Sequence, residues 1–259
     1  MKIGICTSLD KLEKFARFGF DYIEPTVTSL VEMDARALAA AETRLRACGI
    51  AVEACNVFLP RGITLIGPAA DRAAYRAYLD DAAPRVAALG AKYIVFGSGG
   101  ARRAPEGYDP AAARAELRDA ILRAGEAAAA RDLAIVIEPL NTGETNLVNT
   151  VADGLSLARE IAHEGVKLLA DFYHMRRENE PLKNVAEAGS LLRHTHVAQG
   201  QSRAYPLSAQ EDDYAGFFEA LKAGGYTGAV SIEGRTDDED NDAPKALALL
   251  RELSARAGL

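Results

Sequence analysis

Four side chains that can bind a metal ion or move a proton each close a short apolar run in the second half of the chain. Glu138 ends LAIVIE, Asp171 ends VKLLAD, His196 lies at the end of RHTHV, and Glu233 ends AVSIE. In a parallel α/β barrel the carboxyl ends of the strands converge on one face, so these four groups are expected to meet there. Three carboxylates and an imidazole would repel one another without a cation between them. This donor set predicts one divalent ion, with Mn²⁺ or Mg²⁺ favoured and Co²⁺ or Zn²⁺ also compatible.

The two glutamates of this set also suit proton transfer. Glu138 and Glu233 follow strands that would lie on nearly opposite sides of a barrel. A substrate held between them could lose a proton on one face and gain a proton on the other. We therefore expect Glu138 and Glu233 to be the catalytic pair.

Other polar residues follow the same apolar runs. Glu144, His174 and Arg203 are expected at the same mouth; the alternatives are a solvated loop carboxylate, a surface imidazole and a surface arginine. His194 precedes His196 by two residues and should share its strand face, deeper in the fold and hydrogen-bonded. Glu24, after the run YIE, either faces the mouth or forms a structural pair.

Eight apolar runs alternate with longer amphipathic, Ala-rich stretches. The runs begin at Lys2, Tyr22, Ala51, Tyr93, Leu133, Lys167, His194 and Ala229. Apolar positions three and four residues apart in the stretches between them predict helices with one buried face. No G-x-G-x-x-G follows the first run, which removes the main support for an open dinucleotide-binding sheet. The pattern predicts a single (β/α)₈ TIM barrel over residues 1–259.

Three predicted strand-to-helix connections are unusually long. They cover residues 56–69, 97–109 and 198–212, and the barrel model places all three on the catalytic face as walls or lids. Arg61, Arg102 and Arg103 lie in these connections and together could clamp a phosphate. No glycine-rich turn leading into a helix N-terminus accompanies them, so an unphosphorylated substrate is favoured.

Composition narrows the class of protein. The net charge of −7 argues against nucleic acid or an anionic membrane as a partner. No apolar run approaches the length of a membrane span, and MKIGICTSLD lacks the apolar segment of a signal peptide, so a cytoplasmic location is expected. Three cysteines do not make a disulfide framework. The oligomeric state stays open, with a homodimer or homotetramer allowed.

Taken together, these residues resemble the xylose isomerase-like superfamily of sugar epimerases and isomerases, over essentially the whole chain. The resemblance lies in IEPLN with Glu144 beyond it, in the Asp-x-x-His of ADFYHM, in His-x-His-Val-Ala, and in the closing SIEGR. It is greatest to ketose 3-epimerases of the D-tagatose and D-allulose type, with hydroxypyruvate isomerases as near relatives. The resemblance implies that Glu138, Asp171, His196 and Glu233 bind the metal. It also implies that Glu138 and Glu233 are the acid/base pair and that Glu144, His174 and Arg203 contact the substrate.

The expected activity is epimerisation of a small keto-sugar by proton transfer through an enediolate. Return of the proton to the adjacent carbon would instead make the protein an aldose–ketose or hydroxypyruvate isomerase acting on a keto-sugar or keto-acid. A sugar-binding barrel without activity, or a lyase subunit that needs a partner chain, stays open. An abasic-site endonuclease would need about three metal ions and a basic groove, which four histidines and the acidic charge disfavour.

Overall fold

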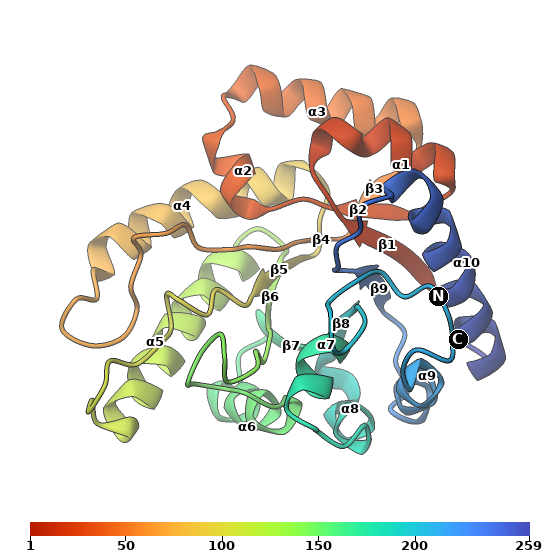
Figure 1. Ribbon diagram of the computed structural model, residues 1–259. Helices are drawn as coiled ribbons and strands as arrows, with labels where there is room; N and C mark the ends of the chain where they lie inside the picture. The colour runs from red at the N-terminus through yellow and green to blue at the C-terminus, as the bar shows by residue number, and fades with distance from the viewer.

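The computed structural model describes residues 1–259 as a barrel of short parallel strands surrounded by helices (Figure 1). The strands are β1 (Lys2–Cys6), β2 (Tyr22–Glu24), β3 (Ala51–Val52), β4 (Ala54–Cys55), β5 (Tyr93–Phe96), β6 (Ala134–Ile137), β7 (Val166–Asp171), β8 (Leu192–Val197) and β9 (Ala229–Ile232). Every ladder between neighbouring strands is parallel. The expected (β/α)-barrel class is therefore confirmed.

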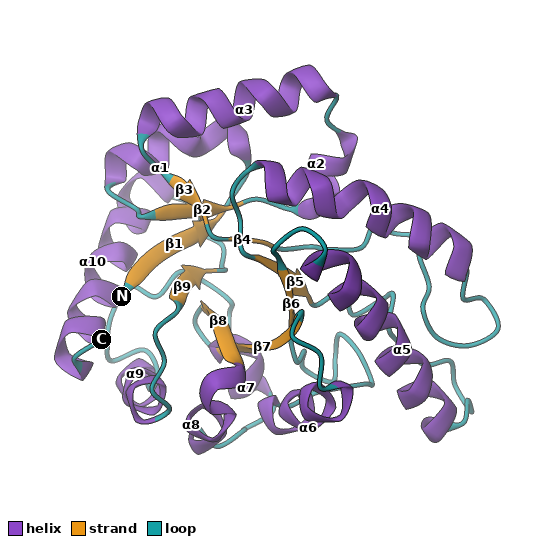
Figure 2. Cartoon of the chain, turned by 180° about the vertical axis from the view of Figure 1, so that it is seen from behind, coloured by secondary structure: helices purple, strands orange, loops and turns teal.

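The helices form an outer ring, and the view from behind shows the strands enclosed by it (Figure 2). They are α1 (Leu12–Phe18), α2 (Val27–Glu32), α3 (Ala35–Cys48), α4 (Arg72–Ala88), α5 (Pro110–Ala129), α6 (Val151–Ile161), α7 (Phe172–Arg177), α8 (Lys183–Ala188), α9 (Tyr214–Ala223) and α10 (Glu239–Ala257), with short 3₁₀ helices at Leu9–Lys11 and Gly189–Leu191. None of the helices is long and apolar enough to cross a membrane.

The barrel closes at the place where the chain interrupts one of the eight predicted strands. The strand order is β3-β2-β1-β9-β8-β7-β6-β5-β4, and Glu53 alone separates β3 from β4. The carbonyl of Glu53 accepts hydrogen bonds from the N–H groups of both Lys92 and Tyr93, so the ladder is irregular at this point. At the carboxyl ends, a parallel bridge pairs Thr26, just after β2, with Asn56, just after β4. The prediction of one strand here was wrong, because the third strand is two pieces.

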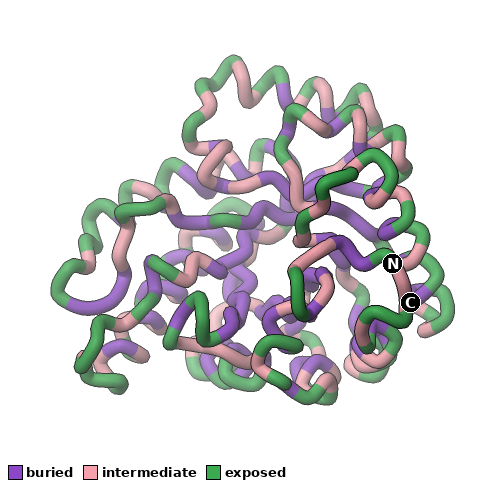
Figure 3. The backbone as a smooth tube through the Cα atoms, viewed as in Figure 1, coloured by how far each residue is buried: buried purple, intermediate pink, exposed green.

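Burial follows this architecture: the strands and inner helix faces are buried, and the outer helix faces are exposed (Figure 3). Most of the apolar core lies between strands and helices. Inside the barrel, one side is a small apolar cluster of Ala54, Val95, Val136 and Leu169. The other side is polar and contains the buried side chains of Glu24, His194 and His196.

Local capping agrees with the sequence signals that define the helix ends. Asp109 accepts a hydrogen bond from the N–H of Ala111 and caps α5, with Pro110 as its first residue. Gly49 ends α3 in the left-handed conformation, with φ of 66°. The three long connections follow β4, β5 and β8, as predicted, so all three lie at the carboxyl ends of the strands.

Candidate metal and proton-transfer site

Strand register brings the four predicted ligands together. Asp171 on β7 and Ser231 on β9 both pair with His196 on β8, so the carboxylate and the imidazole are side by side. Glu138 and Glu233 each extend a strand by one residue, because their N–H groups donate to the carbonyls of the neighbouring strands. One ligand atom from each of Glu138, Asp171, His196 and Glu233 lies within 4.8 Å of all the others. These four residues are called the carboxylate–histidine cluster below.

The cluster leaves buried polar atoms without hydrogen-bond partners. They are Glu138 Oε1, Asp171 Oδ2 and His196 Nδ1, all facing the same small space. The imidazole Nδ1 lies 3.4 Å from Glu138 Oε1 and 3.7 Å from a Glu233 oxygen. Buried polar atoms are almost always satisfied, so a group of unsatisfied polar atoms indicates a missing partner. Carboxylate oxygens and one imidazole nitrogen at this spacing fit a single divalent cation.

Burial and mutual repulsion set the protonation of these carboxyls in the absence of a cation. Burial, followed by the charges of Glu233 and Glu138, raises the pKa of Asp171 to about 7. Burial also raises the pKa of Glu138, and the charge of Glu233 adds to the effect. Such raised values are expected where like charges share one buried site, and a cation would reverse them.

Glu233 lies in different surroundings from Glu138. Its Oε1 accepts a hydrogen bond from Asn56 Nδ2 at 2.9 Å, and its Oε2 pairs with the guanidinium of Arg203. Asn56 is in place because the strand bridge with Thr26 fixes its backbone. The glutamate nearer the open mouth is thus oriented by two donors, whereas Oε1 of Glu138 has none.

Asp171 and His174 lie next to each other on one side of the site. Asp171 Oδ1 accepts from the N–H of Tyr173 at 2.7 Å and caps α7, which leaves Oδ2 free to face the cluster. Asp171 therefore caps the helix with one oxygen and belongs to the cluster with the other. His174 Nδ1 accepts the N–H of Asn141 at 3.1 Å. Because that backbone group can only donate, Nε2 carries the ring hydrogen, and it points into the site unpartnered, 3.6 Å from Asp171 Oδ2.

Glu144 and Arg203 lie at the rim of the cluster. Arg203 Nη1 is 3.3 Å from Glu144 Oε1, and its guanidinium carbon lies 4.9 Å from the centre of the Tyr173 ring. Arg203 has a left-handed backbone with φ of 57°, a costly conformation for a residue other than glycine. All seven residues singled out in the sequence are therefore brought to one mouth.

Three further residues contact the site: Asn56, which the sequence does not single out, Glu24, whose place in the sequence allows two roles, and Arg102, which could have belonged to a phosphate clamp. Asn56 directly follows β4 and pairs with Thr26 in an isolated bridge, and only the barrel closure shows where its side chain points. Glu24 is fully buried and bonds His194 and His196, so of the two interpretations left open it is the structural pair. Arg102 is also fully buried and donates to the carbonyl of Glu138 at 2.7 Å. The phosphate clamp considered for Arg102 is therefore wrong, because its guanidinium is occupied with backbone.

Comparisons with known proteins agree with this architecture. The sequence model of the xylose isomerase-like TIM barrel family matches residues 12–253. The D-psicose 3-epimerase of Agrobacterium fabrum is 30% identical over 241 residues, which cover 86% of this chain and 77% of that protein. An L-ribulose 3-epimerase of a Methylomonas species is 36% identical over 121 residues.

The chain spans less than half the length of the first curated relatives it matches. A crystal structure of D-allulose 3-epimerase from a Methylomonas species superposes with a TM-score of 0.85 at 26% identity, and the match covers 98% of each chain. The family match extends over nearly the whole sequence, and the chain belongs to the xylose isomerase-like TIM barrel family.

Proposed function

We propose that the protein is a metal-dependent epimerase of a small keto-sugar that works by proton transfer between Glu138 and Glu233. The observation that carries the proposal is the carboxylate–histidine cluster with its unsatisfied inward-facing atoms. The similar proteins named above are ketose 3-epimerases, which gives the chemical class of the substrate.

Glu138, Asp171, His196 and Glu233 would hold the ion. When bound, the ion supplies Lewis-acid stabilisation for the negative charge that develops on the substrate oxygens, with Mn²⁺ our first choice. The protein supplies the proton transfer: one glutamate removes a proton from the carbon beside the carbonyl, and the other returns a proton to the opposite face. Reversal of the two roles runs the reaction in the other direction.

The remaining residues orient the substrate and the two glutamates. Asn56 and Arg203 hold the carboxylate of Glu233, so its lone pairs have a fixed direction. The Nε2–H of His174 and the carboxylate of Glu144 offer one donor and one acceptor to hydroxyl groups of a sugar. Burial lowers the pKa of His174 to about 2, so its ring is a neutral donor.

An uncharged substrate fits the rim better than a sugar phosphate. Arg102 is buried against the Glu138 carbonyl, and Arg103 donates to the carbonyl of Gly143. Arg203 is paired with Glu233 and Glu144. These arginines therefore have partners inside the protein, and a kinetic preference of about a hundredfold for a sugar phosphate would contradict this part of the proposal.

The test is turnover of a panel of ketoses and hydroxy-keto acids with added Mn²⁺, followed by NMR in D₂O. The true substrate should gain deuterium at the carbon beside its carbonyl, and metal removal should abolish the exchange. Inversion at one carbon identifies an epimerase, and an aldose product identifies an isomerase. Turnover without solvent exchange would indicate hydride transfer and would exclude the two-glutamate mechanism.

The roles of the glutamates are tested by Glu138→Gln and Glu233→Gln. Each variant should lose at least about a hundredfold in kcat, because a general base commonly contributes that much or more. Substrate binding should weaken far less than turnover. Activity within tenfold of the parent protein in either variant would be incompatible with the proposal.

A further inference from the structure

A buried polar network lies directly beneath the carboxylate–histidine cluster, inside the barrel. Its centre is Glu24, at the end of β2 and fully buried. Glu24 Oε1 is 3.0 Å from His196 Nε2, whereas Oε2 is 2.8 Å from His194 Nε2 and accepts from Ser231 Oγ at 2.5 Å. The Tyr22 hydroxyl completes the chain, 2.8 Å from Ser231 Oγ. Gly4 leaves room for this tyrosine, because a Cβ on Gly4 would overlap the ring.

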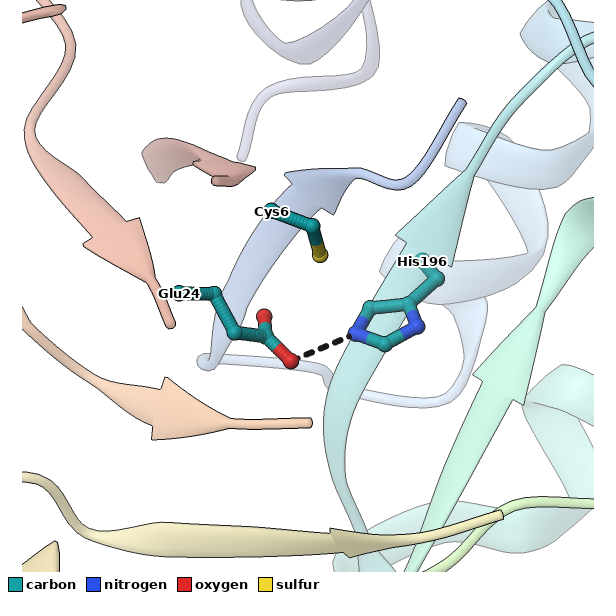
Figure 4. Close-up of side chains that lie close together, drawn as sticks. All are labelled: Cys6, Glu24 and His196. Carbon is teal, nitrogen blue, oxygen red and sulfur yellow. Dashed lines mark hydrogen bonds and ion pairs between the residues drawn. The ribbon is translucent and has the colours of Figure 1, made fainter. Parts of the chain in front are cut away.

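The two ring nitrogens of His196 therefore face two different environments. Nε2 points to Glu24, as the dashed line in Figure 4 shows, and Nδ1 points to Glu138 and Glu233. A carboxylate oxygen can only accept, so Nε2 must carry a hydrogen to make this contact. Nδ1 is then the nitrogen whose lone pair can bind an ion.

We propose that Glu24 is a positioning residue that selects Nδ1 of His196 as the metal-binding atom and fixes the direction of the ring. The inference rests on the metal site proposed above. Histidines that bind metals usually donate their other N–H to a carboxylate or carbonyl, which orients the ring and strengthens the ligand. Here the second oxygen of the same carboxylate is held by His194 and Ser231, so Glu24 cannot rotate without breaking two further bonds.

A competing explanation is a second ion between Cys6, Glu24 and His196, whose ligand atoms also lie within 4.8 Å of one another. Cys6 lies beside the pair in Figure 4 but is not bonded to it. Both oxygens of Glu24 already accept hydrogen bonds from His194, His196 and Ser231. An ion at this place would have to take the position of the hydrogen on Nε2, so the geometry favours the positioning role.

The first experiment measures Mn²⁺ binding by calorimetry on the metal-free parent protein and on the metal-free Glu24→Gln variant. Glutamine keeps the volume, and its amide oxygen can accept from His196, but the negative charge is lost. We expect the Kd for Mn²⁺ to rise by about 10- to 100-fold in Glu24→Gln. Glu180→Gln is the matched control: it makes the same change at another buried glutamate, whose carboxylate accepts from the N–H groups of Val151 and Ala152 outside this network. Its Kd should change by less than about threefold.

A second measurement does not depend on any variant. In ¹⁵N-histidine-labelled protein loaded with diamagnetic Zn²⁺, His196 should show hydrogen on Nε2 and none on Nδ1. The opposite pattern, or an unchanged Kd in Glu24→Gln, overturns the inference while the metal site stands. A parent protein that binds no Mn²⁺ overturns the proposed function and this inference with it. Two ions per chain, one of them lost in Cys6→Ala, would establish the competing site instead.

Discussion

At the scale of single side chains, the two proposed catalytic glutamates differ in what holds them. Glu138 is buried, and its backbone carbonyl rather than its carboxylate receives the Arg102 guanidinium. The Glu233 side chain retains 18% of its surface and is bound by Asn56 and Arg203. Carboxyl groups in unequal surroundings are suited to unequal tasks, one as acid and one as base in a given direction.

Asn56 gives the first prediction at this scale. Asn56→Ala removes the donor to Glu233 Oε1, and hydrogen bonds to charged groups contribute about 1.5–3 kcal/mol. We expect kcat/KM to fall by roughly 10- to 100-fold, measured with the substrate found in the panel. Asn146→Ala is the control, because Asn146 bonds only the backbone of Ala104. Equal activity in the two variants would exclude a role for Asn56.

His174 gives the second prediction at this scale. His174→Ala should raise KM by about three- to tenfold, because it removes one donor to the substrate, and should change kcat little. Since its pKa lies near 2, His174 stays neutral across the working range and should add no limb to the profile of kcat/KM against pH. A limb between about pH 5 and 8 that disappears in His174→Ala would show that its ring titrates.

The sequence predicted the four candidate metal ligands from polar side chains that directly end an apolar run. Glu138, Asp171, His196 and Glu233 all have this form, and the structure gathers them. Asn56 also directly follows an apolar run, but an amide at that place gave no chemical reason to select it, and Arg102 follows no such run. Their roles depend on a strand bridge and on a loop that folds back under β6, neither of which leaves a local pattern in the chain.

At the scale of elements, the Glu138 carboxylate, directly after β6, occupies the space where a side chain on the residue after β5 would begin. A Cβ on Gly97, directly after β5, would overlap Glu138 Oε2. The strand end is therefore shaped to leave room for the carboxylate of its neighbour.

Gly97→Ala should displace the Glu138 carboxylate and weaken Mn²⁺ binding by tenfold or more, with the far-ultraviolet circular dichroism unchanged. The matched control is Gly100→Ala in the same connection, where an added Cβ meets nothing within 4 Å. Similar Mn²⁺ affinities in both variants would mean that Glu138 can move aside without loss of the site.

The order of strands and helices was predictable, because a chain in which apolar runs alternate with amphipathic helices can adopt only a few architectures. The division of the third strand was not. AVEAC has strong strand character, yet Glu53 interrupts it and accepts bonds from Lys2 and Lys92 at the barrel base. The charge of Glu53 within the apolar run would predict the interruption only if Lys2 and Lys92 were already known to lie beside it.

At the scale of the whole molecule, ion binding and stability are linked. An ion that binds only the folded site raises the free energy of unfolding by about 2.7 kcal/mol at a concentration 100 times its Kd. In a chain of this size that corresponds to a melting temperature higher by about 5–10 °C. Treatment with a chelator should remove the increase, and Asp171→Asn should not show it.

The size of this increase should depend on pH. With its pKa raised to about 7, Asp171 holds a proton below that pH in the metal-free protein, and the ion must displace it. The contribution of Asp171 to metal-free stability is full below its unfolded pKa near 4 and is lost as pH rises through about 7. Mn²⁺ should therefore raise the melting temperature more at about pH 8 than at about pH 6. Equal increases in melting temperature at the two pH values would show that Mn²⁺ binding releases no proton from Asp171.

The four members of the carboxylate–histidine cluster all come from the stretch between Glu138 and Glu233, whereas the loops after β4 and β5 come from the first half of the chain. In terms of inheritance, two of the three proposed substrate walls and the proposed chemistry come from different halves of the chain. A first half exchanged with that of a relative would change those two walls and leave the four cluster residues in place. Four first-half residues must match across the joint: Glu24 and Asn56, which reach His196 and Glu233, and Gly97 and Arg102, which lie against the carboxylate and the carbonyl of Glu138.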